Sequence, residues 1–345
     1  MQTEDADDRQ ARRQDGIVLT MRIAIIGAGA AGLVTAARLA EQGRPAEIYE
    51  ASERLGTSAA SWLAGGMLAP YCEAEDAGSG IVAPGLAGID WWAANVPHVR
   101  REGTLVVVPL RDRGDLARFS RRTRGHERIG PDRIAALEPD LAGRFGDALF
   151  FPAEAHLDPR LALESLVDLA VHAGGQVHFG AAVTPSALDH DLIVDCRGFA
   201  AADDMPQLRP VRGEMLILKS REVTLSRPVR LLHPRWPIYV VPRGDGLFMV
   251  GATMVESQDR RGVTARGMVD LLNAAYALHP AFAEAEIVET GSGLRPAFAD
   301  NLPRVSRRGR VVTVNGLYRH GFLLSPAMAG EAVSDILGER LKAAS

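Results

Sequence analysis

Residues 22–43 of the chain read RIAIIGAGAAGLVTAARLAEQG, and the architecture of the sequence is best approached from this stretch. The run IAII predicts a buried β-strand, and the run LVTAARLAEQ predicts a helix. Between the two, Gly27, Gly29 and Gly32 form the pattern G-x-G-x-x-G of a strand, turn and helix that bind a dinucleotide. The stretch therefore predicts an α/β fold with a Rossmann-like domain.

Each glycine of this pattern has a physical reason. Gly27 permits a tight turn, Gly29 lets the backbone approach a pyrophosphate, and Gly32 lets the helix pack closely on the strand. The helix N-terminus supplies free N–H groups and the positive end of a dipole. Glu50 follows about 20 residues later, where its carboxylate would accept hydrogen bonds from ribose hydroxyls. A glutamate argues against a 2′-phosphate, but it does not distinguish NAD from FAD.

The composition excludes several chemistries. The only lysines are Lys219 and Lys342, so a G-x-x-x-x-G-K phosphate loop is absent and pyridoxal chemistry has little support. The two cysteines, Cys72 and Cys196, form no C-x-x-C pair, and no H-E-x-x-H occurs, so we expect no metal site and no disulfide framework. The net charge of −4 argues against a nucleic acid as partner.

The first 20 residues are polar and of mixed charge, unlike a secretory signal. Because Met21 stands directly before the first strand, we expect residues 1–20 to be either a disordered extension or the result of a start codon assigned too early. The apolar run Ile23–Val34 is too short and too rich in glycine to span a bilayer. These features predict a cytoplasmic protein that does not enter a membrane.

The rest of the chain alternates between two kinds of segment. We expect dinucleotide-domain segments at 21–95, 150–205 and 290–345, and a mostly antiparallel substrate domain from 96–149 and 206–289. The periodicity predicts helices at 159–173, 265–278 and 326–341, and strands at 104–110, 176–179, 192–195, 214–218, 238–242 and 247–251. The predicted fold class is therefore α/β in the first domain and α+β overall, with the two domains interleaved.

Six motifs occur in order along the chain. They are the glycine fingerprint with Glu50, ASWLAGGMLAP (60–70), YVVPR (239–243), GATM (251–254), GLRP (293–296) and YRHG (318–321). Together they resemble the FAD-dependent D-amino-acid oxidase family, and within it the glycine oxidases of thiamine biosynthesis. The resemblance extends over residues 21–341, and it implies an FAD-binding domain with an interleaved antiparallel-sheet substrate domain.

The resemblance implies which residues contact FAD. Those expected at the pyrophosphate and adenosine are Gly27, Ala28, Gly29, Ala30, Ala31, Gly32, Glu50 and Ala51, with Val183 at the adenine through its backbone. Those expected along the flavin are Ala60, Ser61, Gly65, Gly66, Met67, Arg319, His320, Gly321, Phe322 and Leu323. Because no cysteine lies beyond Cys196, we expect FAD to be bound without a covalent bond.

The resemblance also implies a substrate site. Arg295 resembles the family's carboxylate clamp, since a planar guanidinium can hold both carboxylate oxygens and a lysine cannot. Tyr239 would add a hydroxyl to the same carboxylate, and Met254 would narrow the pocket. Arg319 would act on the substrate or through its backbone atoms alone. Each residue has a plainer alternative, as a surface arginine or as a tyrosine or methionine of the core.

The implied reaction is hydride transfer from Cα of glycine or a similar small amino acid to flavin N5. It gives an imine, with O2 reduced to hydrogen peroxide, and the imine would pass to a thiazole synthase. Three alternatives stay open: a D-amino-acid dehydrogenase with another electron acceptor, a non-catalytic FAD-binding scaffold and an NAD-linked imine reductase. The sequence also leaves open the preferred side chain and whether the protein is a homo-oligomer.

Overall fold

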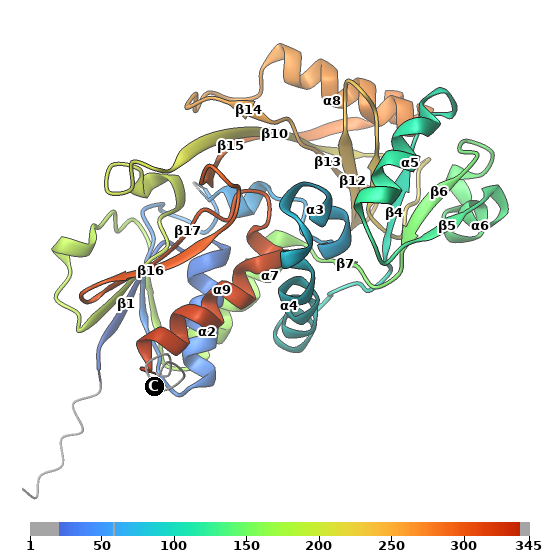
Figure 1. Cartoon of the computed structure of the whole chain (residues 1–345). Coiled ribbons are helices and arrows are strands. Elements are labelled where there is room, and N and C mark those ends of the chain that lie inside the picture. The colour runs from blue at the N-terminus through green and yellow to red at the C-terminus, as the bar shows by residue number, and fades with distance from the viewer. Residues whose placement is uncertain (1–20, 58, 339–345) are drawn as a thin grey trace, which may run out of the picture.

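A computed structural model describes residues 21–57 and 59–338 of the chain. They form a six-stranded and a nine-stranded sheet, at the lower left and the upper right of Figure 1. The predictions for residues 1–20 and for the end of the last helix beyond residue 338 lie outside the described residues. Within the described ranges, no helix is both long enough and apolar enough to cross a bilayer.

The six-stranded sheet has the strand order β16-β17-β9-β1-β2-β8. Its strands are β1 (Ile23–Ile26), β2 (Glu47–Tyr49), β8 (Gln176–His178), β9 (Leu192–Asp195), β16 (Arg304–Arg308) and β17 (Val311–Asn315). Its pairs are parallel except that of β16 with β17. A parallel sheet assembled from such distant segments confirms the predicted Rossmann-like domain.

The glycine turn joins β1 to α2 (Ala30–Glu41), as the sequence predicts. Gly27 has φ +102°, in the region that favours glycine. A Cβ on Gly32 would collide with the carbonyl oxygen of Gly27. The helix can therefore pack this closely on the turn only because residue 32 has no side chain.

Helices cover one face of the six-stranded sheet. α2, α7 (Pro159–His172) and α9 (Gly321–Ile336) pack on this face, where Figure 1 shows them together. α4 (Val82–Asn95) packs against α9 and extends the same core. The opposite face is covered by an irregular segment that includes Val183 and Leu188. The predicted helix at 159–173 is thus confirmed as α7.

The nine-stranded sheet has the order β14-β10-β13-β12-β11-β4-β6-β5, with β15 paired to β10. Its strands are β4 (Thr104–Val107), β5 (Glu127–Ile129), β6 (Ala148–Phe151), β10 (Arg209–Lys219), β11 (Val229–Leu231), β12 (Ile238–Gly244), β13 (Leu247–Gly251), β14 (Val255–Glu256) and β15 (Glu286–Ala297). Every strand pair is antiparallel except that of β4 with β11. The predicted mostly antiparallel sheet is thus confirmed.

The two faces of this sheet have different neighbours. The predicted helix at 265–278 is confirmed as α8, which packs on one face together with α6 (Pro131–Leu137). The other face meets α3 (Pro70–Ala77) and α5 (Arg113–Arg122). β3 (Met67–Leu68), just ahead of α3 in the chain, pairs antiparallel with β7 (Ala155–His156) to form a short ribbon. Tyr239 and Val241, two residues apart on β12, both point away from α8.

The predicted start of the last helix at Pro326 is wrong, because α9 begins at Gly321. A proline inside a helix leaves the carbonyl four residues earlier without its N–H partner. Here that carbonyl belongs to Phe322, and the indole N–H of Trp92 donates to it at 2.7 Å. A side chain from α4 thus replaces the missing hydrogen bond, which local sequence could not reveal.

Two of the predicted domain boundaries fall inside strands. Residue 150 lies within β6 and residue 290 within β15, and both strands belong to the nine-stranded sheet. The patterns also did not predict α3 or α4, which together occupy most of the segment between residues 70 and 95. The division of the chain into two discontinuous domains stays a prediction.

Replacing Gly32 by alanine should lower the free energy of unfolding by about 1–3 kcal/mol, because the methyl group would collide with the Gly27 carbonyl. The matched control is Gly330→Ala in α9, where a Cβ would meet no described atom within 4 Å. There alanine should raise the free energy of unfolding by up to about 1 kcal/mol. Urea-unfolding curves measure both, and shifts of the same sign in the two variants would contradict this account of the turn.

Candidate active site

A cavity of about 330 Å³ brings distant parts of the chain together. Its lining includes Phe119, Arg230, Tyr239, Met254, Arg295 and Arg319. The last four of these are the residues that the sequence predicts for the substrate site. The fold therefore gathers all four predicted residues at one cavity, although they come from four separate motifs.

The position of Arg295 depends on glycines around it. Arg295 projects from the same side of β15 as Gly291 and Gly293, because alternate strand residues share a face. A Cβ at these two glycines would approach Leu63 at 2.7 and 3.1 Å, so their absence of side chains lets the segment before β3 pack on the strand. A Cβ on Gly213, in the adjacent β10, would collide with the Arg295 guanidinium.

The charge of Arg295 lacks a carboxylate partner among the described residues. Its Nη1 donates to the carbonyl oxygen of Thr253 at 3.1 Å, and none of the ion pairs between described residues includes it. Burial and the nearby Arg319 lower the pKa of Arg295 to about 10, which leaves it protonated at neutral pH. A partly buried guanidinium in this state favours an anionic ligand.

Tyr239 and Arg319 already have protein partners. Arg319 Nη2 donates to the Glu73 carboxylate at 3.2 Å, and its Nη1 donates to Asp76 at 3.1 Å. The Tyr239 hydroxyl accepts a hydrogen bond from Arg319 and donates one to Glu73. Burial raises the pKa of Tyr239, so the hydroxyl keeps its proton at neutral pH. Contact of either residue with a substrate stays a prediction.

Met254 lies at the rim of the cavity rather than in the core, since half of the residue is exposed. Its sulfur accepts hydrogen bonds from the Tyr318 hydroxyl and from Arg319 Nη1, both at 3.5 Å. The alternative of a core methionine therefore does not apply.

The nucleotide end of the predicted site surrounds the glycine turn. Glu50 is buried at the end of β2, and its carboxylate accepts the N–H groups of Ala28 at 2.8 Å and Ser52 at 3.0 Å. A carboxylate at this position of a dinucleotide-binding fold is the group to which ribose hydroxyls donate. Ser61 Oγ accepts the N–H of Ala30, the first residue of α2, at 3.2 Å. This end of the helix is where a pyrophosphate binds in such folds.

An arginine of the nine-stranded sheet holds the segment that leads from Gly65 to Met67. Arg243 of β12 donates to the carbonyl oxygens of Ala64 at 2.9 Å and Gly65 at 3.0 Å. Gly66 has φ +69°, and a Cβ on it would collide with the carbonyl oxygen of Leu157. The backbone of this predicted flavin loop is therefore fixed on both sides.

The other predicted cofactor contacts lie near the ends of helices and strands, except Val183, which lies in the irregular segment after β8. A Cβ on Gly321 would meet no described atom within 4 Å, so the backbone at the start of α9 is open to a ligand. Phe322 and Leu323 are buried, so their backbone N–H groups are the parts that remain for a cofactor. The remaining positions are Ala31 in α2, Ala51 after Glu50, Ala60 before Ser61, Val183 close to the Ala181 N–H that donates to the Glu50 carbonyl, and His320 before α9.

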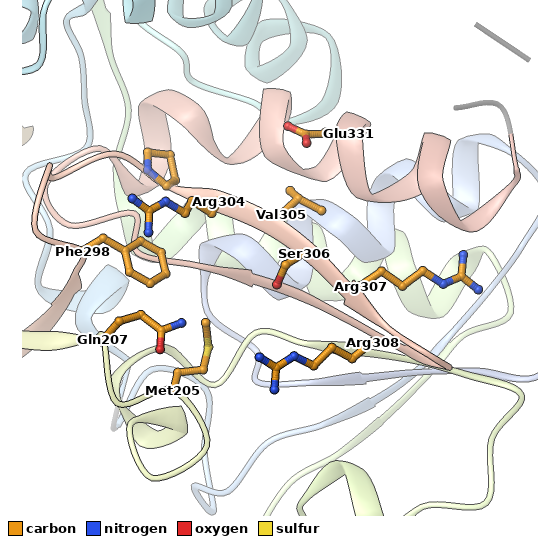
Figure 2. A pocket seen from close by; sticks show the side chains of 10 residues that line it. Met205, Gln207, Phe298, Arg304, Val305, Ser306, Arg307, Arg308 and Glu331 are labelled. Carbon is orange, nitrogen blue, oxygen red and sulfur yellow. The ribbon is translucent and has the colours of Figure 1, made fainter. Parts of the chain in front are cut away.

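A second hollow, of about 420 Å³, lies along the edge strand β16 (Figure 2). Three arginines of this strand line it, and two of them already have carboxylate partners: Arg304 pairs with Asp300, and Arg307 pairs with Asp335. None of the predicted substrate or cofactor residues lines this hollow. The cavity beside Arg295 is therefore the candidate active site.

Sequence reasoning missed three contributors to the site. Glu73 stands in the acidic run CEAED, one residue after the GGMLAP motif, and that position was the available signal. Arg243 belongs to the YVVPR motif, but its contacts with the loop at 64–65 arise only when the two sheets meet. Gly213 carries no local signal, because only the pairing of β10 with β15 places it beside Arg295.

Comparison with known proteins identifies relatives over nearly the whole chain. Residues 22–336 match the family DAO, described as FAD dependent oxidoreductase. The chain is 56% identical over 321 residues to a Rhizobium etli protein named as a thiamine biosynthesis oxidoreductase, ThiO, with 93% of this chain and 98% of that protein covered. It is 25% identical over 366 residues to the glycine oxidase of Pseudomonas aeruginosa, with 93% and 96% covered.

Solved structures share the fold. The crystal structure of glycine oxidase from Geobacillus kaustophilus aligns with a TM-score of 0.79 at 24% identity, covering 91% of this chain and 94% of the other. Iminodiacetate oxidase from Chelativorans sp. aligns with a TM-score of 0.75 at 24% identity, covering 92% and 95%. The glycine turn, with Glu50 and Ser61 beside it, fits the cofactor that this family uses. The chain belongs to the DAO family of FAD-dependent oxidoreductases, and it is an FAD-dependent enzyme.

Proposed function

We propose that the protein oxidises glycine or another small amino acid at the carbon that bears the amine. The observation that carries this proposal is the protonated Arg295 guanidinium, which faces a cavity of about 330 Å³ without a described carboxylate partner. A guanidinium binds both oxygens of a carboxylate with a defined orientation. Relatives named glycine oxidase support an amine as the other end of the substrate.

Different residues of the chain would hold the cofactor and the substrate. The glycine turn, Glu50 and Ser61 would hold one end of FAD, and the Gly65–Met67 loop with the start of α9 would hold the other. Bound FAD supplies the acceptor for two electrons from the substrate. Arg295 would fix the carboxylate, and because its own position is fixed by β15, it would also fix the orientation of Cα. A neutral amine then needs no protein base.

We further propose O2 as the electron acceptor and thiamine synthesis as the pathway. The name of the Rhizobium etli relative supports the pathway. A Synechocystis protein named bifunctional ThiO/ThiG matches 92% of this chain with 52% of its own length, at 25% identity. A second named function fused to the same kind of chain supports direct transfer of the imine product to a thiazole-forming partner.

Release of hydrogen peroxide from glycine, sarcosine and D-alanine tests the reaction. The purified protein with FAD should release peroxide with at least one of the three, and rapid reoxidation of the reduced flavin in air should accompany it. Reduction of the flavin without peroxide would indicate a dehydrogenase with another acceptor. A flavin that stays oxidised with every amine would indicate a non-catalytic FAD-binding protein.

Replacing Arg295 by lysine should raise KM for the amino acid by about 10- to 100-fold, because one point charge cannot reproduce two parallel hydrogen bonds. FAD content should not change, since the hydrogen bond of Arg295 within the described residues goes to Thr253 and not to the nucleotide end of the site. Steady-state kinetics and the flavin absorbance of the purified variant measure the two effects. An unchanged KM would overturn the role of Arg295.

Replacing Glu50 by glutamine should weaken FAD binding by about 10-fold and leave KM unchanged at saturating FAD. The carboxylate accepts the N–H groups of Ala28 and Ser52, and an amide NH2 cannot accept in place of one oxygen. FAD titration of the apoprotein measures the change. Equal losses of FAD in the Glu50 and Arg295 variants would contradict the separation of the two sites.

A further inference from the structure

We propose that Glu73 is the positioning residue of the substrate cavity: its buried carboxylate engages Tyr239 and Arg319, so that Arg295 is left as the guanidinium available to the substrate carboxylate. This inference rests on the proposed function. It explains why the cavity would bind one carboxylate group, at Arg295. Three observations support it: the contacts of Glu73, the ion pairs of the arginines around the cavity, and the hydrogen bond that the Tyr239 hydroxyl donates to Glu73.

Glu73 lies in the first turn of α3 and contacts β12 and the residues directly before α9. Its side chain is 9% exposed. Its Oε1 accepts hydrogen bonds from the Tyr239 hydroxyl and, at 3.2 Å, from Arg319 Nη2. Its Oε2 lies 3.5 Å from Nδ1 of His320, directly before α9. One carboxylate thus connects α3, β12 and the start of α9.

The backbone of α3 is fixed independently of the cavity. The buried Glu154 accepts the N–H groups of Tyr71 at 2.9 Å and Cys72 at 2.7 Å. Pro70 begins the helix, where a proline fits without losing a hydrogen bond. Glu73 therefore approaches the cavity from a rigid element, and a shortened side chain at this position could not follow its partners.

The arginines around the cavity differ in whether they have a carboxylate partner. Arg319 faces the carboxylates of Glu73 and Asp76, and Arg230 Nη2 lies 3.3 Å from Glu75. Among the described residues, Arg295 is the cavity arginine without such a partner. Without Glu73, Arg319 would keep only the half-exposed Asp76 and would compete with Arg295 for a substrate carboxylate.

The Tyr239 proton is the second consequence of Glu73. A phenol has one proton to donate, and here it goes to Glu73 while the hydroxyl accepts from Arg319. Burial would raise the pKa of Glu73, but Arg319, His320 and Arg230 outweigh it and lower this pKa to about 2. Glu73 is therefore an anion at neutral pH, and its hydrogen bond holds the Tyr239 hydroxyl in one orientation beside Arg319.

The test compares Glu73→Gln with wild type in the FAD-loaded protein. Glutamine keeps the size of the side chain but removes its charge. Binding of acetate, a carboxylate without an amine, should tighten by about 10-fold, because Arg319 would then have only the half-exposed Asp76 as its partner and could also bind a carboxylate in the cavity. The kcat with the best amine substrate should fall by about 10-fold or more, because the carboxylate would bind in more than one orientation. Acetate titration followed by flavin absorbance and steady-state kinetics measure the two changes.

Glu138→Gln is the matched control for loss of a buried ion pair. Glu138 is fully buried, accepts Arg227 Nε at 2.7 Å and does not line the cavity. Both variants should have a lower Tm, but only Glu73→Gln should change the acetate Kd and kcat. Wild-type values of both in Glu73→Gln, with a normal FAD content, would overturn the proposal.

Glu73→Asp keeps the charge and remains informative if Glu73→Gln does not fold. It should bind acetate with an affinity close to wild type, while kcat falls because the shorter side chain cannot reach Tyr239 and Arg319 together. Tighter acetate binding in Glu73→Asp, or an unchanged kcat, would contradict the positioning role. Failure of the proposed reaction would be seen differently, as a wild-type protein that oxidises no amine while acetate still binds and responds to Glu73→Gln.

Discussion

Three guanidinium groups lie largely out of water beside one cavity, and the arrangement of the site depends on how their charges are compensated. A buried cation is unfavourable unless it is paired or hydrogen-bonded. The carboxylates of α3 compensate Arg230 and Arg319, which requires this short helix to lie against β12 and the start of α9. Among the described residues Arg295 has only a carbonyl oxygen as its partner, so it is the guanidinium with which a carboxylate ligand would pair.

Much of the fold could be predicted because its signals are local. The strand, glycine turn and helix at 22–43 depend on residues that lie close together in the sequence. The collision that a side chain at Gly32 would cause explains why the G-x-G-x-x-G pattern has a glycine there. The antiparallel strands were visible as apolar runs with turn residues between them. Arg295 and Tyr239 could be predicted only through motif resemblance, because nothing in their immediate neighbours distinguishes them from other arginines and tyrosines of the chain.

The features that escaped prediction depend on contacts between distant segments. Pro326 lies inside α9 because Trp92, more than two hundred residues earlier, replaces the lost hydrogen bond. Gly213 matters because β15 pairs with β10 in a register that brings the Arg295 guanidinium over it. Glu73 gains its place because α3, β12 and α9 meet at one point. These contacts form only when the whole chain has folded, so no local spacing of residues in the sequence could predict them.

Arg243 has a consequence for the stability of the whole molecule. Its guanidinium belongs to the nine-stranded sheet, yet it donates to the backbone of Ala64 and Gly65, which follow Ser61, the residue whose hydroxyl accepts the N–H of Ala30 at the nucleotide-binding turn. A ligand that binds only the folded state stabilises every part that must be folded with it. FAD bound beside the glycine turn would therefore also stabilise the nine-stranded sheet against unfolding.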